Sequence, residues 1–298
     1  MPIIIESCLL MENNPPPPKR HPLERPPEPR PQDEAPRQRI NLRIPSVEPI
    51  ATYALIAINV LIFVIRAFSP EQDEQIFLWG ANHAPDVLQN GEYYRLFTSM
   101  FLHASIFNGF GGYALQNSLH LILNMYILYA IGSSLERLFG HTRFLIIYLL
   151  GGLAGSVLST LLGGQNSYSV GASGAVFAIL GGEFAYLYHH RKLMGAAGEA
   201  RRRSLIVFGV INLVFGLAST LPGSAMRVDN WAHIGGLAGG LILSWFISPI
   251  LNLRPHPDHP GEILGEDVNP LSKKYWVVSV YATALVILLF IGVSLARR

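Results

Sequence analysis

Apolar runs about 20 residues long recur along this chain and constrain its fold more than any other feature. Such a run crosses the hydrocarbon core of a bilayer as a helix, because a helix satisfies its backbone hydrogen bonds internally. Half of the 298 residues are hydrophobic and only 14% are charged, a balance typical of integral membrane proteins. The predicted fold class is all-α, a polytopic membrane helical bundle. Seven spans are expected, at residues 50–67, 118–135, 143–163, 169–188, 203–221, 230–249 and 275–295. The fourth and sixth are rich in glycine, so we expect them to lie at the centre of the bundle and to contact each other.

The segments between and around these runs predict the domain organisation. Residues 1–48 are rich in Pro, Arg, Glu and Gln, so they cannot bury enough apolar surface to offset ordering, and we expect a disordered or polyproline II cytoplasmic tail. Residues 49–249 are expected to form a six-span core with a long, interfacial outer connection at about 68–117. A cytoplasmic linker at 250–274 and a seventh span within 275–298 follow. Residues 1–11 lack the features of a signal peptide, and Met11, where polar sequence begins, is an alternative first residue.

Lys and Arg predict the orientation, because basic residues concentrate in cytoplasmic loops. The seven spans place all but five of the 22 Lys and Arg residues on the same side as the tail. The other five are Arg66, Arg95, Arg227, Arg297 and Arg298. We therefore expect a cytoplasmic N-terminus and an outer C-terminus. The tail has no organelle-targeting pattern, which favours a prokaryotic plasma membrane.

Polar residues of three separate predicted spans fall at a similar shallow depth below the outer face. His120 and Asn124 lie near the outer end of the second span, four residues apart and so on one helix face. Ser173 lies in the outer third of the fourth span, and His233 lies just inside the outer end of the sixth. Ionisable residues are costly inside a bilayer, so their presence indicates function.

These residue types fit nucleophilic acyl transfer. A serine hydroxyl is a weak nucleophile until a base takes its proton, which imidazole does near pH 7. We assign Ser173 as the nucleophile and His233 as the general base. The nearest intramembrane carboxylate, Glu183, is roughly 15 Å deeper at the helical rise, so a dyad without a carboxylate is predicted. His120, Asn124 and the Ser173 N–H are candidate donors to the oxyanion.

Each residue also has a structural interpretation. A serine in a membrane helix bonds readily to a carbonyl one turn earlier, and Asn124 is a candidate for an interhelical bond. His120 and His233 are alternative metal ligands, although zinc would need a third protein ligand. A transporter would instead favour inverted repeats and polar groups near mid-bilayer. The shared depth of the polar residues favours the enzyme, for which no metal or cofactor is expected.

The motifs around these residues resemble the rhomboid family of intramembrane serine proteases over about residues 90–249. The matching motifs are GxSG at residues 171–174, HxxxN at His120 and Asn124, and AHxxGxxxG with His233, Gly236 and Gly240. The resemblance implies a six-span core plus a C-terminal seventh span (6+1). It also implies that Ser173 and His233 form the catalytic dyad, and that His120 and Asn124 hold the oxyanion.

The resemblance extends to supporting residues and to two departures. Gly171 and Gly174 flank the serine, and Phe177 stands where the family commonly has an aromatic residue against the catalytic histidine. Residues 135–140 resemble a structural motif at the end of the second span. The departures are Tyr94 before Arg95, where the family often has Trp, and an apparent insertion at residues 106–117.

The activity implied is cleavage of single-span membrane protein substrates near the outer face. The substrate helix must unwind locally, because helical carbonyls are already hydrogen-bonded. The alternative is a catalytically silent rhomboid-like protein that binds membrane clients without cutting them. The net charge of +2 does not indicate a nucleic-acid partner.

Overall fold

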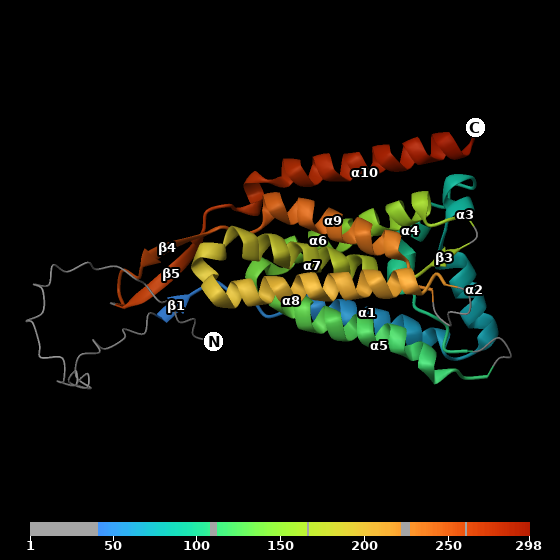
Figure 1. Cartoon of the computed structure of the whole chain (residues 1–298), viewed down its shortest axis with the longest axis horizontal. Coiled ribbons are helices and arrows are strands. Elements are labelled where there is room, and N and C mark those ends of the chain that lie inside the picture. Colours follow the sequence, from blue (N-terminus) through green and yellow to red (C-terminus); the bar gives the residue numbers. More distant parts are fainter. Residues whose placement is uncertain (1–40, 108–111, 166, 222–226, 260) are drawn as a thin grey trace, which may run out of the picture.

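Long helices running side by side form the body of the protein (Figure 1). The structure is a computed structural model that describes residues 41–107, 112–165, 167–221, 227–259 and 261–298. The long helices are α1 (Ile50–Arg66), α5 (Ser118–Ile127), α6 (Ser133–Leu162), α7 (Ser173–His189), α8 (Arg191–Ala218), α9 (Asn230–Ile247) and α10 (Tyr275–Ala296). A π-helical turn at Leu128–Gly132 joins α5 to α6.

Glycines divide two of these helices. Gly140 in α6 has a φ of 76°, and Gly195 in α8 has a φ of 48°. Such backbone conformations are open to glycine but strained for other residues, so the chain bends at both points. Helix is therefore present in each of the seven predicted ranges, which confirms the mostly helical class.

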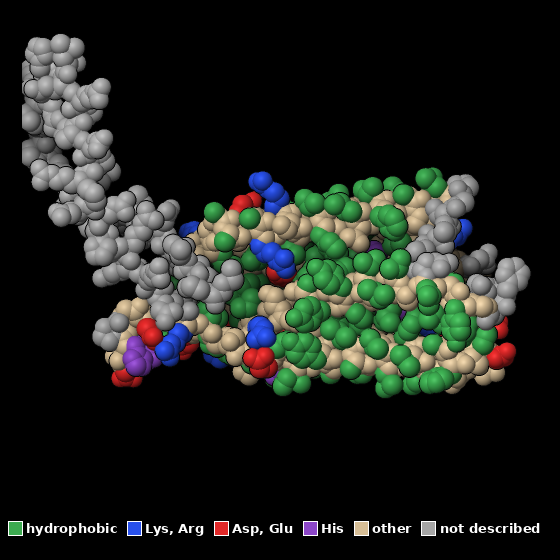
Figure 2. Space-filling model, turned by 90° about the horizontal axis from the view of Figure 1, so that it is seen from below, with side chains coloured by type: hydrophobic (Ala, Val, Ile, Leu, Met, Phe, Trp, Pro, Cys, Tyr) green, Lys and Arg blue, Asp and Glu red, His purple; other side chains and the backbone are tan. Residues whose placement is uncertain are grey.

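Length and composition mark only some of these helices as membrane-crossing. Among the described residues, two helical stretches, Ser118–Leu162 and Tyr275–Ala296, are long and apolar enough to cross a membrane, and Ile50–Arg66 is a shorter apolar helix. Hydrophobic side chains cover much of the visible flank of the bundle, and charged side chains gather toward its ends (Figure 2). The number of spans remains a prediction.

Helices α6, α7 and α9 form the centre of the bundle and pack backbone to backbone. A Cβ added at Gly181 of α7 would lie 2.5 Å from the Leu237 carbonyl oxygen of α9. A Cβ added at Gly155 of α6 would lie 2.6 Å from the Ala232 carbonyl oxygen of α9. Glycines allow helices to approach closely inside a bilayer, where the hydrophobic effect does not drive helices together. The predicted contact between the fourth and sixth apolar runs is confirmed.

A small sheet lies at one end of the bundle, at the left of Figure 1. Strand β1 (Asn41–Arg43) pairs in parallel with β5 (Glu262–Asp267), which pairs antiparallel with β4 (Leu251–Pro255). The expectation of an irregular tail up to residue 48 is therefore wrong for Asn41–Arg43, because the edge of β5 supplies hydrogen-bond partners from a distant segment. Residues 1–40 lie outside the described residues.

Short elements close the opposite end of the bundle. They are α2 (Pro70–Gly80), β2 (Asn82–His83), α3 (Ala84–Leu88), α4 (Arg95–Thr98) and two 3-10 helices, Ser99–Phe101 and Leu115–Asn117. Strand β2 pairs antiparallel with β3 (Tyr168–Ser169), which immediately precedes α7. Another 3-10 helix, Leu271–Lys273, precedes α10. The apparent insertion at 106–117 is described only in part, because residues 108–111 lie outside the described residues.

Candidate active site

One cavity of about 380 Å³ brings together the four polar residues that the sequence singles out. His120 and Asn124 of α5, Ser173 of α7 and His233 of α9 all line it. Residues of β3 and α8 complete its wall, including Tyr168, Ser169, Phe208, Asn212 and Phe215. Three helices that are distant in sequence therefore present polar groups to one space.

Ser173 is the first residue of α7. The first N–H groups of a helix have no acceptor inside the helix, and they favour negative charge at that end. Two residues earlier, Gly171 has a φ of 129°, and its N–H donates to the Ser99 carbonyl oxygen at 2.9 Å. A Cβ at Gly171 would lie 2.9 Å from Cε1 of His120. Glycine is therefore required there both by the backbone and by the imidazole beside it.

His233 lies in the first turn of α9, which Asp229 caps. The Asp229 Oδ1 accepts from the Ala232 N–H at 3.0 Å, and its Oδ2 accepts from the Ser159 hydroxyl of α6. The His233 ring stacks on Phe177, with centroids 4.2 Å apart and planes 8° apart. Phe177 thus makes the contact that its position four residues after Ser173 predicts.

Among the described residues, no carboxylate is hydrogen-bonded to the His233 imidazole. Its Nδ1 is buried and has no hydrogen-bond partner within the described part of the chain. Asp229 lines the same cavity, but its described hydrogen bonds are to the Ala232 N–H and the Ser159 hydroxyl and not to the imidazole. Glu183 pairs instead with Arg201, at 2.6 Å and 2.9 Å. Stacking and backbone position therefore orient the ring.

Ser173 and His233 are not hydrogen-bonded to each other among the contacts of the described residues, but both side chains line the same cavity. Catalytic hydrogen bonds are often long or poorly aligned in unliganded enzymes and tighten in the substrate complex. The arrangement therefore provides a hydroxyl and an imidazole on adjacent, closely packed helices.

His120 and Asn124 are held by backbone contacts. The Ala104 N–H donates to the Nδ1 of His120 at 3.4 Å. A neutral imidazole that accepts at Nδ1 carries its proton on Nε2. The Asn124 side-chain amide donates to the His120 carbonyl oxygen at 2.7 Å and keeps its second N–H. Two N–H donors are thus available near Ser173.

Sequence reasoning missed two charged groups near the site. Asp229 was not assigned a role, although an Asp at the start of an apolar helical run is a helix N-cap signal. Arg66, expected as an outer-face charge, is 2% exposed and forms an ion pair with Asp73 at 2.8 Å. No local pattern marks Arg66 as buried, because its partner Asp73 lies on the next helix, α2, which must first pack against the end of α1.

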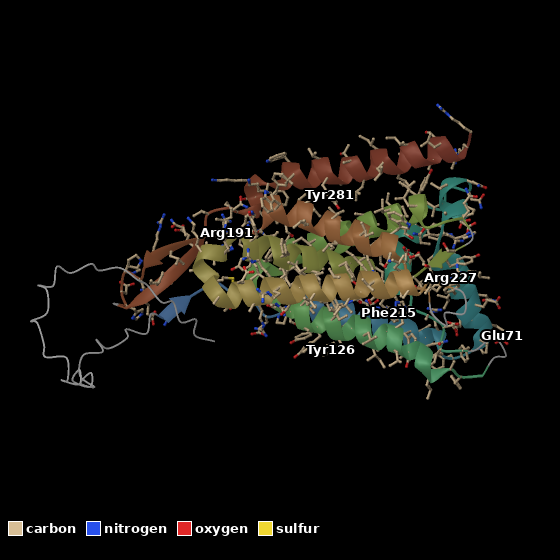
Figure 3. All side chains as sticks on the ribbon, viewed as in Figure 1. Glu71, Tyr126, Arg191, Phe215, Arg227 and Tyr281 are labelled. Atoms are coloured by element: carbon tan, nitrogen blue, oxygen red, sulfur yellow. The ribbon has the colours of Figure 1, made fainter. Side chains whose placement is uncertain are left out.

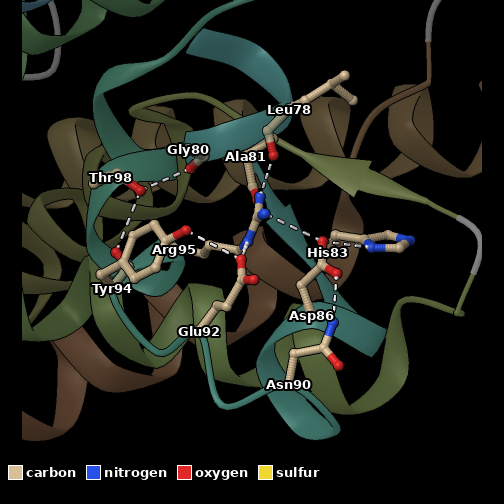
Figure 4. Close-up of polar contacts among 10 residues, drawn as sticks. All are labelled: Leu78, Gly80, Ala81, His83, Asp86, Asn90, Glu92, Tyr94, Arg95 and Thr98. Atoms are coloured by element: carbon tan, nitrogen blue, oxygen red, sulfur yellow. Dashed lines mark hydrogen bonds and ion pairs between the residues drawn. The ribbon is translucent and has the colours of Figure 1, made fainter. Parts of the chain in front are cut away.

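A second buried arginine organises the outer loop (Figure 4). Arg95 donates to the carbonyl oxygens of Leu78 and Ala81, at 2.5 Å and 3.0 Å, and pairs with Glu92 at 2.6 Å. Its guanidinium carbon lies 5.8 Å from the centre of the Tyr94 ring. Tyr94 and Arg95 thus form an aromatic–cation pair, and Arg95 ties α4 to the C-terminal end of α2.

Comparisons with known proteins agree with these motifs. The family model described as Rhomboid domain matches residues 90–250. The chain is 34% identical over 196 residues to "Rhomboid protease GluP" of Bacillus subtilis (strain 168), covering 65% of this chain and 34% of that protein. It is 33% identical over 207 residues to "RHOMBOID-like protein 4" of Arabidopsis thaliana, covering 68% of this chain and 45% of that protein.

A third relative is "RHOMBOID-like protein 6, mitochondrial" of Arabidopsis thaliana, 38% identical over 168 residues. That match covers 56% of this chain and 48% of the relative. The chain thus spans about a third to a half of the length of these curated relatives.

Proposed function

Because this chain belongs to the rhomboid family of helical membrane proteins, we propose that it is an intramembrane serine endopeptidase with a Ser173–His233 dyad. The observation that carries the proposal is the common cavity of Ser173, His233, His120 and Asn124. The similarity to a relative named as a protease adds support. Other relatives are named only as rhomboid-like, so activity has to be tested on this chain.

In the proposed reaction, the Ser173 Oγ attacks the carbonyl carbon of a peptide bond while its proton passes to His233. The carbonyl oxygen becomes an oxyanion, which accepts hydrogen bonds from Asn124, His120 and the Ser173 N–H. When the intermediate collapses, the C–N bond breaks and His233 gives the proton to the leaving amine. Water then attacks the acyl-enzyme, and the same residues release the carboxylic acid product and restore Ser173.

The proposed substrates are single-span membrane proteins cleaved near the outer membrane face. Apolar side chains make up much of the cavity wall, including Leu123, Ile127, Val176, Phe208 and Phe215. This wall suits a peptide segment that comes from lipid. The segment must be unwound to expose a carbonyl, so we expect helix-destabilising small residues at the cleavage site.

We further propose seven spans, with a cytoplasmic N-terminus. Arg191 and Arg227 mark opposite ends of the bundle (Figure 3), and Arg227 lines the cavity. The cavity would then open toward the outer face. We place the protein in a prokaryotic plasma membrane, for which the Bacillus subtilis relative is the support; the Arabidopsis thaliana relatives do not distinguish this from an organelle membrane.

The test is cleavage, in liposomes, of a single-span substrate with a Gly- and Ala-rich outer juxtamembrane segment. Wild type is compared with Ser173→Ala, His233→Ala and the control Ser244→Ala. Ser244 is a buried serine of α9 outside the cavity wall. We expect cleavage and labelling by a fluorophosphonate probe in wild type and in Ser244→Ala, and neither in Ser173→Ala. We expect no cleavage in His233→Ala.

Two results would contradict the proposal. Cleavage by Ser173→Ala would show that another group is the nucleophile. A wild-type protein that neither cleaves nor reacts with the probe would favour the alternative, a rhomboid-like protein that binds membrane clients without cutting them.

A further inference from the structure

Arg66, at the C-terminal end of α1, carries a buried charge that the proposed reaction does not use. Its side chain is 2% exposed, and its Nε lies 2.8 Å from the Oδ1 of Asp73, whose side chain is 7% exposed. A buried charge is costly unless it is paired and hydrogen-bonded. The pair therefore holds α2 against the end of α1 at a defined point.

The guanidinium also reaches the segment that leads to the active site. The Arg66 Nη1 donates to the His103 carbonyl oxygen at 2.6 Å. That carbonyl and the Ala104 N–H belong to one planar peptide group. The same Ala104 N–H donates to the Nδ1 of His120. One peptide group thus connects the buried charge to a proposed oxyanion donor.

This connection has an electrostatic consequence. A cation bonded to the oxygen of a peptide group polarises the group, so its N–H becomes a stronger donor. A stronger bond to Nδ1 favours the His120 tautomer that is protonated on Nε2. That nitrogen faces the loop before Ser173, because a Cβ at Gly171 would lie 3.0 Å from it.

Packing also restricts the orientation of the His120 ring. The His103 ring is 1% exposed and stands edge-on against the His120 ring, with centroids 5.2 Å apart. Ala104 and His120 line the cavity, whereas Arg66 and His103 do not. Arg66 therefore cannot touch the substrate in the cavity, and any effect on the reaction must pass through the residues between.

We propose that Arg66 is a positioning residue, which acts through the His103–Ala104 peptide group to hold His120 with its Nε2–H toward the oxyanion. This inference rests on the proposed function, because it assigns a positioning partner to His120, one of the proposed oxyanion donors. It predicts that Arg66 matters to turnover only while His120 is present.

A double-mutant cycle tests this dependence, because it isolates the coupling between two residues. We expect Arg66→Gln to lower kcat about tenfold with KM changed less than about twofold, because the lost interaction acts in the transition state. In the His120→Ala background, the same change should lower kcat by less than about twofold. An equal loss in both backgrounds would overturn the inference and leave Arg66 a structural residue.

Arg95→Gln is the matched control. Arg95 is also buried, pairs with a carboxylate and donates to backbone carbonyls of the same outer loop. It makes no contact with the His103–Ala104 peptide group among the described contacts. Its effect on kcat should therefore be equal in the wild-type and His120→Ala backgrounds. If Arg66→Gln does not fold, Arg66→Lys replaces it, with a smaller loss that should again disappear without His120.

A second measurement needs no turnover and separates this inference from the proposed function. In ¹⁵N-histidine-labelled protein, NMR reads which nitrogen of His120 carries the proton, and His120→Ala identifies its signals. We expect Nε2 protonation in wild type and a larger Nδ1-protonated fraction in Arg66→Gln. Nδ1 protonation of His120 in wild type, or an unchanged tautomer in Arg66→Gln, would overturn the inference even if cleavage proceeds. Loss of cleavage alone would count only against the proposed function.

Discussion

Gly236 of α9 is the position where one added methyl group should most directly separate the proposed dyad. A Cβ there would collide with the Gly174 carbonyl oxygen of α7, and would lie 2.8 Å from its carbon and 3.2 Å from its Cα. These are backbone atoms, so no side chain can rotate away. Carbon atoms in contact are normally about 3.5–4.0 Å apart, so α7 and α9 must separate by roughly 1 Å.

The separation acts on the reacting groups. Ser173 immediately precedes Gly174, and His233 lies one turn before Gly236 on the contacting helix. Overpacking of this kind costs about 1–3 kcal/mol of stability. A misplacement of about 1 Å can lower the rate about 10²-fold. We therefore expect Gly236→Ala to fold, with modestly lower stability, and to lose about 99% of its activity.

The assay compares initial cleavage rates in liposomes with thermal unfolding in detergent. Gly209→Ala on α8 is the control, because a Cβ there would lie at an ordinary 3.6 Å from Leu180 Cδ2. Alanine also favours a helix over glycine by about 1 kcal/mol, so Gly209→Ala should be at least as stable as wild type. A Gly236→Ala rate within about twofold of wild type would refute the reasoning, since the helices could not then be in backbone contact.

Two further predictions concern helix ends. Glu136 accepts hydrogen bonds from the Ala51 N–H and from the N–H and hydroxyl of Thr52, at the start of α1. Hydrogen bonds to a charged group are stronger than those to a neutral one, so Glu136→Gln should lower the thermal unfolding midpoint, and an unchanged midpoint would contradict this role. Asp229→Ala should cost about 1 kcal/mol as a lost N-cap. Asp229→Asn, which keeps an acceptor, should cost less in the same unfolding assay, and an equal cost would contradict capping.

The sequence predicted the helices and the grouping of the polar residues because both depend on local or periodic signals. Apolar runs mark helices in a bilayer, and topology sets the depth of each residue along its helix. Glycine-rich faces marked the fourth and sixth runs as neighbours. These two signals were enough to place Ser173 and His233 on contacting helices, and the structure brings both to one cavity with His120.

The contacts that the sequence did not reveal are those between segments with no shared periodicity. Strand β1 depends on β5, more than 200 residues away, since each of its registered partners lies at 262–264. Arg66 reads as an exposed cation at a helix end until α2 packs against the end of α1 and supplies Asp73. Local patterns record neither partner, so neither contact could be predicted from one sequence.

Within the described part of the chain no carboxylate is bonded to His233, and this changes what must hold the imidazole in place. Stacking on Phe177 fixes the plane of the ring but does not fix its position within that plane. Asp229 does not supply that restraint, because its described hydrogen bonds are to the Ala232 N–H and the Ser159 hydroxyl and none is to the imidazole. It acts on the helix instead, by setting where α9 begins and by joining it to α6. The position of the base is therefore determined by the backbone of α9, so close glycine contacts between helices have the role that a hydrogen-bonded carboxylate has in a triad.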